Sequence, residues 1–179
     1  NAVQSITDMN PVIISVTEAA ANAQTVTETL SEFESWKIQM SDPSIDVNAK
    51  LAIFASMVQT TSDLSPAQQV QVQQEAIKMF TSAFQTVAFN SVLDSLINNA
   101  SSLTPQPMAF VMQENTFSQQ MLERIQKDLK FEILIVVVGG KFLIYSTGSS
   151  SEIKATTELD AFLQSSAVEL LTHNHPEEN

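Results

Sequence analysis

The residues with the clearest capacity for chemistry lie near the end of the sequence, in the segment Thr172-His173-Asn174-His175-Pro176. This segment contains both histidines of the chain. In an extended segment alternate side chains point to the same face, so His173 and His175 would share a face with their Cα atoms roughly 6.5–7 Å apart. That spacing lets two imidazoles bind one metal ion, and Pro176 would end the strand because it lacks a backbone donor. The alternative is an exposed tail with two ordinary titrating histidines.

A candidate acid–base group precedes the histidines in a strongly apolar region. Glu132 stands at the start of the apolar run 131–138, which is followed by Gly139-Gly140 and a second apolar run, 141–145. Two apolar, β-branched runs across a Gly-Gly pair predict a tight β-hairpin, and the first strand should be buried on both faces. The carboxylate of Glu132 is then either a solvated strand end or a placed acid–base group.

The sequence between the hairpin and the histidines predicts three further elements. After a polar loop around Gly148 we expect a short strand at 153–155, a helical turn at 157–164 and a strand at 167–171. The last strand would deliver His173 and His175 at its end.

This element order resembles the beginning of the JAB/JAMM (MPN-type) metallopeptidase domain, including its RadC-type relatives, over residues 131–176. The motif residues of that family correspond to Glu132, His173, His175 and Pro176 here. The resemblance implies that the two histidines bind Zn²⁺, and that Glu132 moves a proton from the zinc-bound water to a leaving amine.

The sequence departs from the family at the third zinc ligand. In the family this ligand is an aspartate about ten residues after the second histidine, and catalytic zinc sites normally use three protein ligands. Here the sequence ends at Asn179, and only Glu177 and Glu178 follow Pro176 as substitutes. We therefore expect this chain to bind zinc weakly or not at all. The absence of methionine at Asn1 is typical of a processed product or a part of a longer polypeptide.

Composition excludes several classes of function. The chain of 179 residues has no cysteine, so disulfides, thiolate metal sites and thiol nucleophiles are absent. Its net charge of −12 leaves no basic stripe for phosphate groups, which argues against nucleic-acid binding. No apolar run reaches the length of about 18–20 residues that a membrane span needs. The compartment stays open.

The first two-thirds of the sequence has helical periodicity. Apolar residues from Val12 to Met40 alternate steps of three and four, which predicts a helix that needs a facing helix. The facing helix would belong either to another subunit or to the chain's own third helix. A second helix should begin at Asp46, and a third should begin with the capping box Ser65-Pro66-Ala67-Gln68 and run to about Asn98.

A shorter helix is expected after an extended connector at 103–107. Residues 116–119 repeat the capping-box pattern, with Thr116 as the cap, and apolar positions continue to Leu129. This helix would link the helical part to the sheet and cover one sheet face.

Together these patterns predict an α+β protein in which a helical bundle or long-helix module precedes a small sheet domain with a β-hairpin. We expect a helical assembly module at 1–107 without strand between 12 and 97, a connecting helix at 108–130 and a small α/β domain at 131–179. The favoured function is a structural protein of a virion, secretion apparatus or filament, a homo-oligomer or protein-partner component joined through helix 12–40. The alternative is a zinc-dependent JAMM-like peptidase whose third metal ligand lies beyond Asn179.

Overall fold

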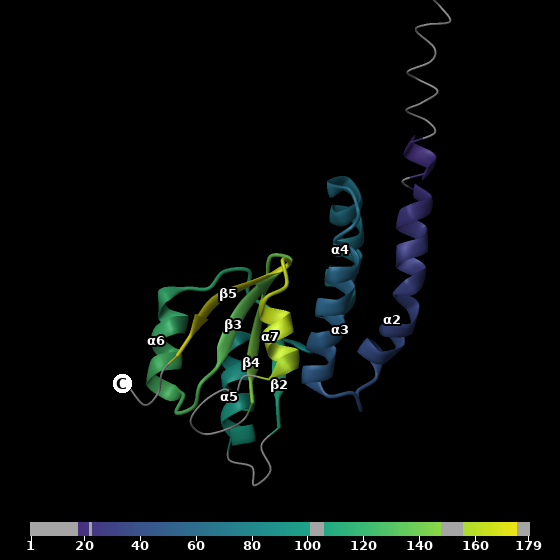
Figure 1. The fold of residues 1–179 in the computed structure, drawn as a ribbon. Helices are drawn as coiled ribbons and strands as arrows, with labels where there is room; N and C mark the ends of the chain where they lie inside the picture. Colours follow the sequence, from purple (N-terminus) through teal and green to yellow (C-terminus); the bar gives the residue numbers. More distant parts are fainter. Residues whose placement is uncertain (1–17, 22, 101–105, 148–155, 175–179) are drawn as a thin grey trace, which may run out of the picture.

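The computed structural model of the chain describes residues 18–21, 23–100, 106–147 and 156–174. It is an α+β protein in which most helices precede a five-stranded mixed sheet, as the sequence predicts (Figure 1). Within the described residues no helix is both long and apolar enough to cross a membrane.

A helical arm, residues 23–41, leads into the described structure. It is helical at 23–32, turns at Phe33 and continues as α2 (Glu34–Ser41). Three of its apolar side chains, seven residues apart, are buried: Val26, Phe33 and Met40. They belong to one core with side chains of α3 (Val47–Thr60) and α4 (Pro66–Ser82). In its described part the apolar stripe therefore faces the chain's own helices, which is the second of the two alternatives that the sequence left open.

The starts of α3 and α4 follow the local signals in the sequence. Asp46 precedes α3 as its N-cap residue. At the start of α4 the Ser65 Oγ accepts a hydrogen bond from the Gln68 N–H at 3.4 Å, and the Gln68 Oε1 accepts one from the Ser65 N–H at 3.0 Å. The predicted capping box is confirmed.

The predicted end of the third helix is wrong. The helix α4 stops at Ser82, and the chain then forms β1 (Thr86–Val87) and a separate helix, α5 (Phe89–Ala100). The two-residue β1 also contradicts the expectation of no strand between residues 12 and 97. The physical reason lies far along the chain, because both carboxylate oxygens of Glu114 accept the Phe89 N–H at 3.0 Å and so cap α5.

One sheet joins segments from both sides of the boundaries that we expected at 107 and 130. Its strand order is β1-β2-β4-β3-β5, with β1 parallel to β2 and the other neighbours antiparallel. The remaining strands are β2 (Met108–Met112), β3 (Leu134–Val138), β4 (Lys141–Ser146) and β5 (Val168–His173). The strand β2, expected to be part of a connecting helix, lies inside the sheet between β1 and β4.

The hairpin and the elements after it agree with the sequence, whereas the cap of the connecting helix does not. Gly139 and Gly140 have φ of 58° and 75°, and they join β3 to β4. The helix α7 (Thr157–Leu163) precedes β5 as expected, and residues 153–155 lie outside the described structure. The helix α6 (Gln119–Asp128) is capped by Ser118, with Met121 at its third position, and not by Thr116.

Two apolar cores lie on opposite faces of the sheet. The first core lies between the sheet and α3, α4 and α7 and continues between α3, α4 and the arm, and the second lies beneath α5 and α6 (Figure 1). Successive residues of β3 alternate between the cores: Leu134, Val136 and Val138 point to the first, and Ile133 and Ile135 to the second. The α6 helix thus covers a sheet face, as predicted.

Candidate functional site

Glu132 and His173 lie at the same end of the paired strands β3 and β5, and their side chains point to the same face of the sheet. His173 ends β5 and faces Leu134 of β3 across an antiparallel pair, so these two side chains share a face. Phe131 and Ile133 belong to the second core, so Glu132 between them points to the opposite face, the one that Leu134 occupies. Glu132 is half-buried and His173 is exposed, and each makes contacts with its surroundings.

Asn174, to which the sequence assigned no role, joins the end of β5 to the segment that carries Glu132. Its side chain is 7% exposed. The Asn174 Oδ1 accepts the Ile133 N–H at 2.7 Å, and the Asn174 Nδ2 donates to the Phe131 carbonyl oxygen at 3.0 Å. Both backbone partners flank Glu132, so Asn174 holds the Glu132 segment against the strand end that carries His173. The only signal in the sequence was its position between two histidines that were expected to share the other face.

The described residues do not complete a metal site. His175, Glu177 and Glu178 lie outside the described structure, and the described part of the chain has no cluster of three histidine, aspartate or glutamate side chains that could hold a metal ion. A catalytic zinc normally needs three protein ligands. The described residues therefore do not by themselves fit Zn²⁺, and we derive no metal-dependent step from them.

Among the described residues, Tyr145 has a strongly shifted pKa. Burial raises the pKa of Tyr145 to about 12. Its Oη donates a hydrogen bond of 2.7 Å to the Asn48 Oδ1, which links β4 to α3. Tyr145 therefore stays protonated near neutral pH and acts as a buried hydrogen-bond donor between the sheet and a helix.

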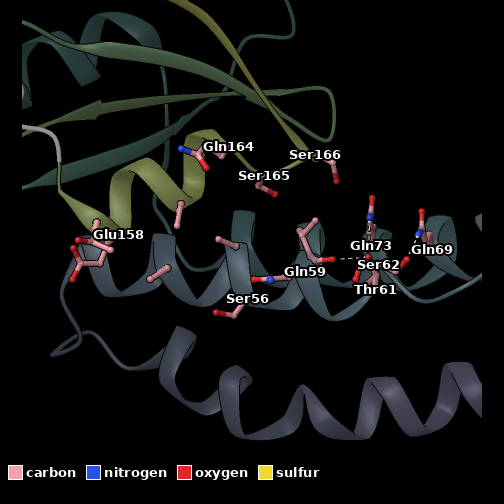
Figure 2. Close-up of a pocket in the computed structure, with 15 residues that line it drawn as sticks. Ser56, Gln59, Thr61, Ser62, Gln69, Gln73, Glu158, Gln164, Ser165 and Ser166 are labelled. Atoms are coloured by element: carbon pink, nitrogen blue, oxygen red, sulfur yellow. Dashed lines mark hydrogen bonds between the residues drawn. The ribbon is translucent and has the colours of Figure 1, made fainter.

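A groove of about 640 Å³ lies between α3, α4 and α7 (Figure 2). Glutamine and serine side chains dominate its rim, and Glu158 is its one ionisable group. Buried Thr61 donates to the Val58 carbonyl oxygen and accepts a 2.9 Å hydrogen bond from Gln73 Nε2. The groove has the chemistry to hydrogen-bond a neutral group. It has no paired base and nucleophile, and it does not include Glu132 or His173.

A second, apolar groove lies beside the last strand of the sheet. This edge groove has a volume of about 380 Å³, and its lining consists of Phe117, Leu122, Phe142, Leu171 and Thr172. Leu170 and Leu171 of β5 are 45% and 43% exposed. The described sheet thus ends in an apolar surface that no sequence pattern had indicated.

Comparison of the chain with protein-family models, with curated proteins and with solved structures finds no match. The function is therefore argued from the residues and their geometry.

Proposed function

We propose that this chain is a structural protein that assembles with copies of itself through the outer side of its helical arm. The observation that carries the proposal is Ile38, which is 73% exposed and is the most exposed large apolar side chain among the described residues. Ile38 lies two positions from buried Met40, which places it on the opposite side of α2.

The packing of the arm leaves this outer side available. The arm docks onto α3 and α4 mainly along the stripe of Val26, Phe33 and Met40, and most of its other side chains are exposed. Glu34 and Lys37 flank Ile38 with opposite charges, so two such surfaces can meet without local repulsion. The stripe that the sequence offered for assembly is occupied internally, and we place the subunit contact on the opposite side of the same helix.

Molar mass in solution tests this proposal. The wild-type chain should form an oligomer in size-exclusion chromatography with light scattering, and Ile38→Asp should reduce it to a monomer with an unchanged circular-dichroism spectrum. Gln39→Asp is the matched control, because it adds the same charge at the neighbouring exposed position without removing an apolar side chain. A wild-type monomer, or an oligomer that Ile38→Asp leaves intact, would contradict the proposal.

A second candidate function, a JAMM-like zinc site, is favoured by the placement of Glu132 and His173 on one face. Leu134 faces His173, and Asn174 binds the backbone of Ile133. His173 and His175 would hold the metal, Glu132 would be the acid–base group, and a third ligand would have to come from residues after Asn179 or from a partner.

Calorimetric titration with Zn²⁺ distinguishes the second candidate. The present chain should bind little zinc, and a chain extended beyond Asn179 should bind it stoichiometrically. His175→Ala should abolish that binding, whereas Glu132→Gln should leave it intact and remove any hydrolysis. Equal, negligible binding with and without the extension would leave the two histidines without a metal role.

A further inference from the structure

We propose that β5 and the edge groove form a binding site for an extended, basic segment of a partner protein, which adds a strand to the sheet and places an apolar side chain in the groove. This site is separate from the arm surface, and it stands or falls independently of assembly through Ile38.

The strand β5 forms one edge of the described sheet. Among the described strands β5 is the last in the sheet order, and it pairs with β3 on one side only. Lysine, proline and bulges commonly protect natural edge strands, and β5, with the sequence Val-Glu-Leu-Leu-Thr-His, has a bulge but neither lysine nor proline. Its two leucines are instead almost half exposed. Such an edge is suited to main-chain pairing with another strand.

A bulge in β5 directs Leu171 to the groove. Thr172 faces Ile135 and Leu170 faces Val136, so Leu171 is the extra residue between the two pairs. Bulges re-aim side chains at sheet edges. Leu171 lines the groove together with Phe142 of β4 and residues 117 and 122 beside and within α6.

A partner strand paired with β5 would fit the spacing of this groove. Strands in a sheet lie about 4.8 Å apart, and alternate side chains point to the same face. A strand added outside β5 would therefore direct every second side chain toward the face that holds Thr172 and α6. The groove of about 380 Å³ has room for a large apolar side chain. Backbone pairing would supply affinity, and the groove would select the side chain.

Charge identifies the occupant. Glu169 is exposed on β5, and the strand contains no lysine or arginine. A second copy paired through the same strand would bring another Glu169 to this edge, where like charges are unfavourable. A segment with lysine or arginine on alternate positions would meet opposite charge instead. We therefore assign the site to a basic partner strand and not to a second β5.

Fluorescence anisotropy with the full chain tests the site. The probe is a labelled peptide about ten residues long, a length that matches natural strands. Valine and lysine alternate along it, and phenylalanine takes the place of one central lysine, so that phenylalanine and the lysines share one face. We expect micromolar binding, and binding weaker by about tenfold or more when glutamate replaces lysine in the peptide. Leu171→Asp should weaken binding of the basic peptide by about tenfold, whereas Ile38→Asp on the arm should leave it unchanged.

A second variant keeps the test decisive if Leu171→Asp alters folding. Glu169→Lys changes only an exposed side chain, and it should weaken binding of the lysine peptide and strengthen binding of the glutamate peptide. Equal binding of the lysine peptide by the wild type and both variants overturns the proposal. Peptide binding that appears only after removal of residues 175–179 also overturns it, because the chain would then cover its own edge. So does an oligomer that Leu171→Asp converts to monomers, because a second copy would then occupy the site.

Discussion

The two faces of the sheet are covered to different degrees. The first core has several helical segments over it and includes a cluster of phenylalanines with ring centroids 4.4 Å apart for Phe54 and Phe80 and 5.4 Å apart for Phe80 and Phe162. The second core lies beneath α5 and α6, and at its rim Phe117 and Phe142 remain partly exposed beside the edge groove. The second face therefore leaves apolar surface exposed where its cover ends.

This difference predicts that loss of a large side chain is most damaging in the first core. Phe80→Ala should lower the free energy of unfolding by about 3–5 kcal/mol, because Phe80 is fully buried and contacts three other phenylalanines. Phe142→Ala at the rim of the second core should cost about 1–2 kcal/mol. Urea unfolding of both variants measures the two values. Equal losses would show that both faces are packed to the same degree.

The arm belongs to the well-covered side, and a charge on its inner stripe should release it. Val26→Asp should lower the free energy of unfolding by about 3 kcal/mol, because Val26 is 5% exposed and its replacement buries an unpaired carboxylate. Ile38→Asp on the outer side should change stability by less than about 0.5 kcal/mol. Urea unfolding combined with limited proteolysis of the arm measures this. Dissociation of an oligomer by Val26→Asp without loss of stability would instead place the stripe between subunits.

On the less covered side of the sheet, the two hydrogen bonds of Asn174 should contribute less to the free energy of unfolding than the buried side chains of Phe80 and Val26 do. Asn174→Ala removes the partners of the Ile133 N–H and the Phe131 carbonyl, and it should cost about 1–3 kcal/mol. Asn174→Asp is the comparison, since a carboxylate keeps the acceptor for the Ile133 N–H but places a second acceptor against the Phe131 carbonyl oxygen. Amide hydrogen exchange at Ile133 should rise in the alanine variant and stay low in the aspartate variant. Unchanged exchange in both would remove Asn174 from its bridging role.

Removal of the Tyr145 hydroxyl should lower the free energy of unfolding least among these substitutions. Tyr145→Phe should cost about 0.5–1.5 kcal/mol through loss of the hydrogen bond to Asn48. The folded pKa of about 12 exceeds the ordinary value of 10.0, so the contribution of Tyr145 is complete below pH 10 and is lost as pH rises toward 12.

The absorbance of tyrosinate reports this titration directly, because Tyr145 is the only tyrosine of the chain. The folded protein should titrate near pH 12, and the urea-unfolded chain near pH 10. Titration at the same pH in both states would contradict the burial of this hydroxyl.

Features that depend on a few neighbouring residues could be predicted from the sequence. The Ser65–Gln68 capping box, the start of a helix at Asp46 and the Gly139-Gly140 hairpin all formed as predicted, because each is set by residues at most four positions apart. The buried β3 was also predicted, because its apolar run is continuous and bounded by turn residues. A strand was predicted at 167–171, and β5 forms there with slightly later bounds, Val168–His173.

Features that depend on contacts between distant segments were decided by the tertiary structure. Between α4 and α5 the chain pairs with β2 as β1, the Glu114 carboxylate caps α5, and β2 becomes a strand because β1 and β4 pair with it on either side. The pairing of Asn174 with the backbone around Glu132 and the edge groove at Leu171 likewise join residues far apart in the sequence. Sequence periodicity fixes which side chains share a face, but only the packed chain determines which backbone groups and which faces meet.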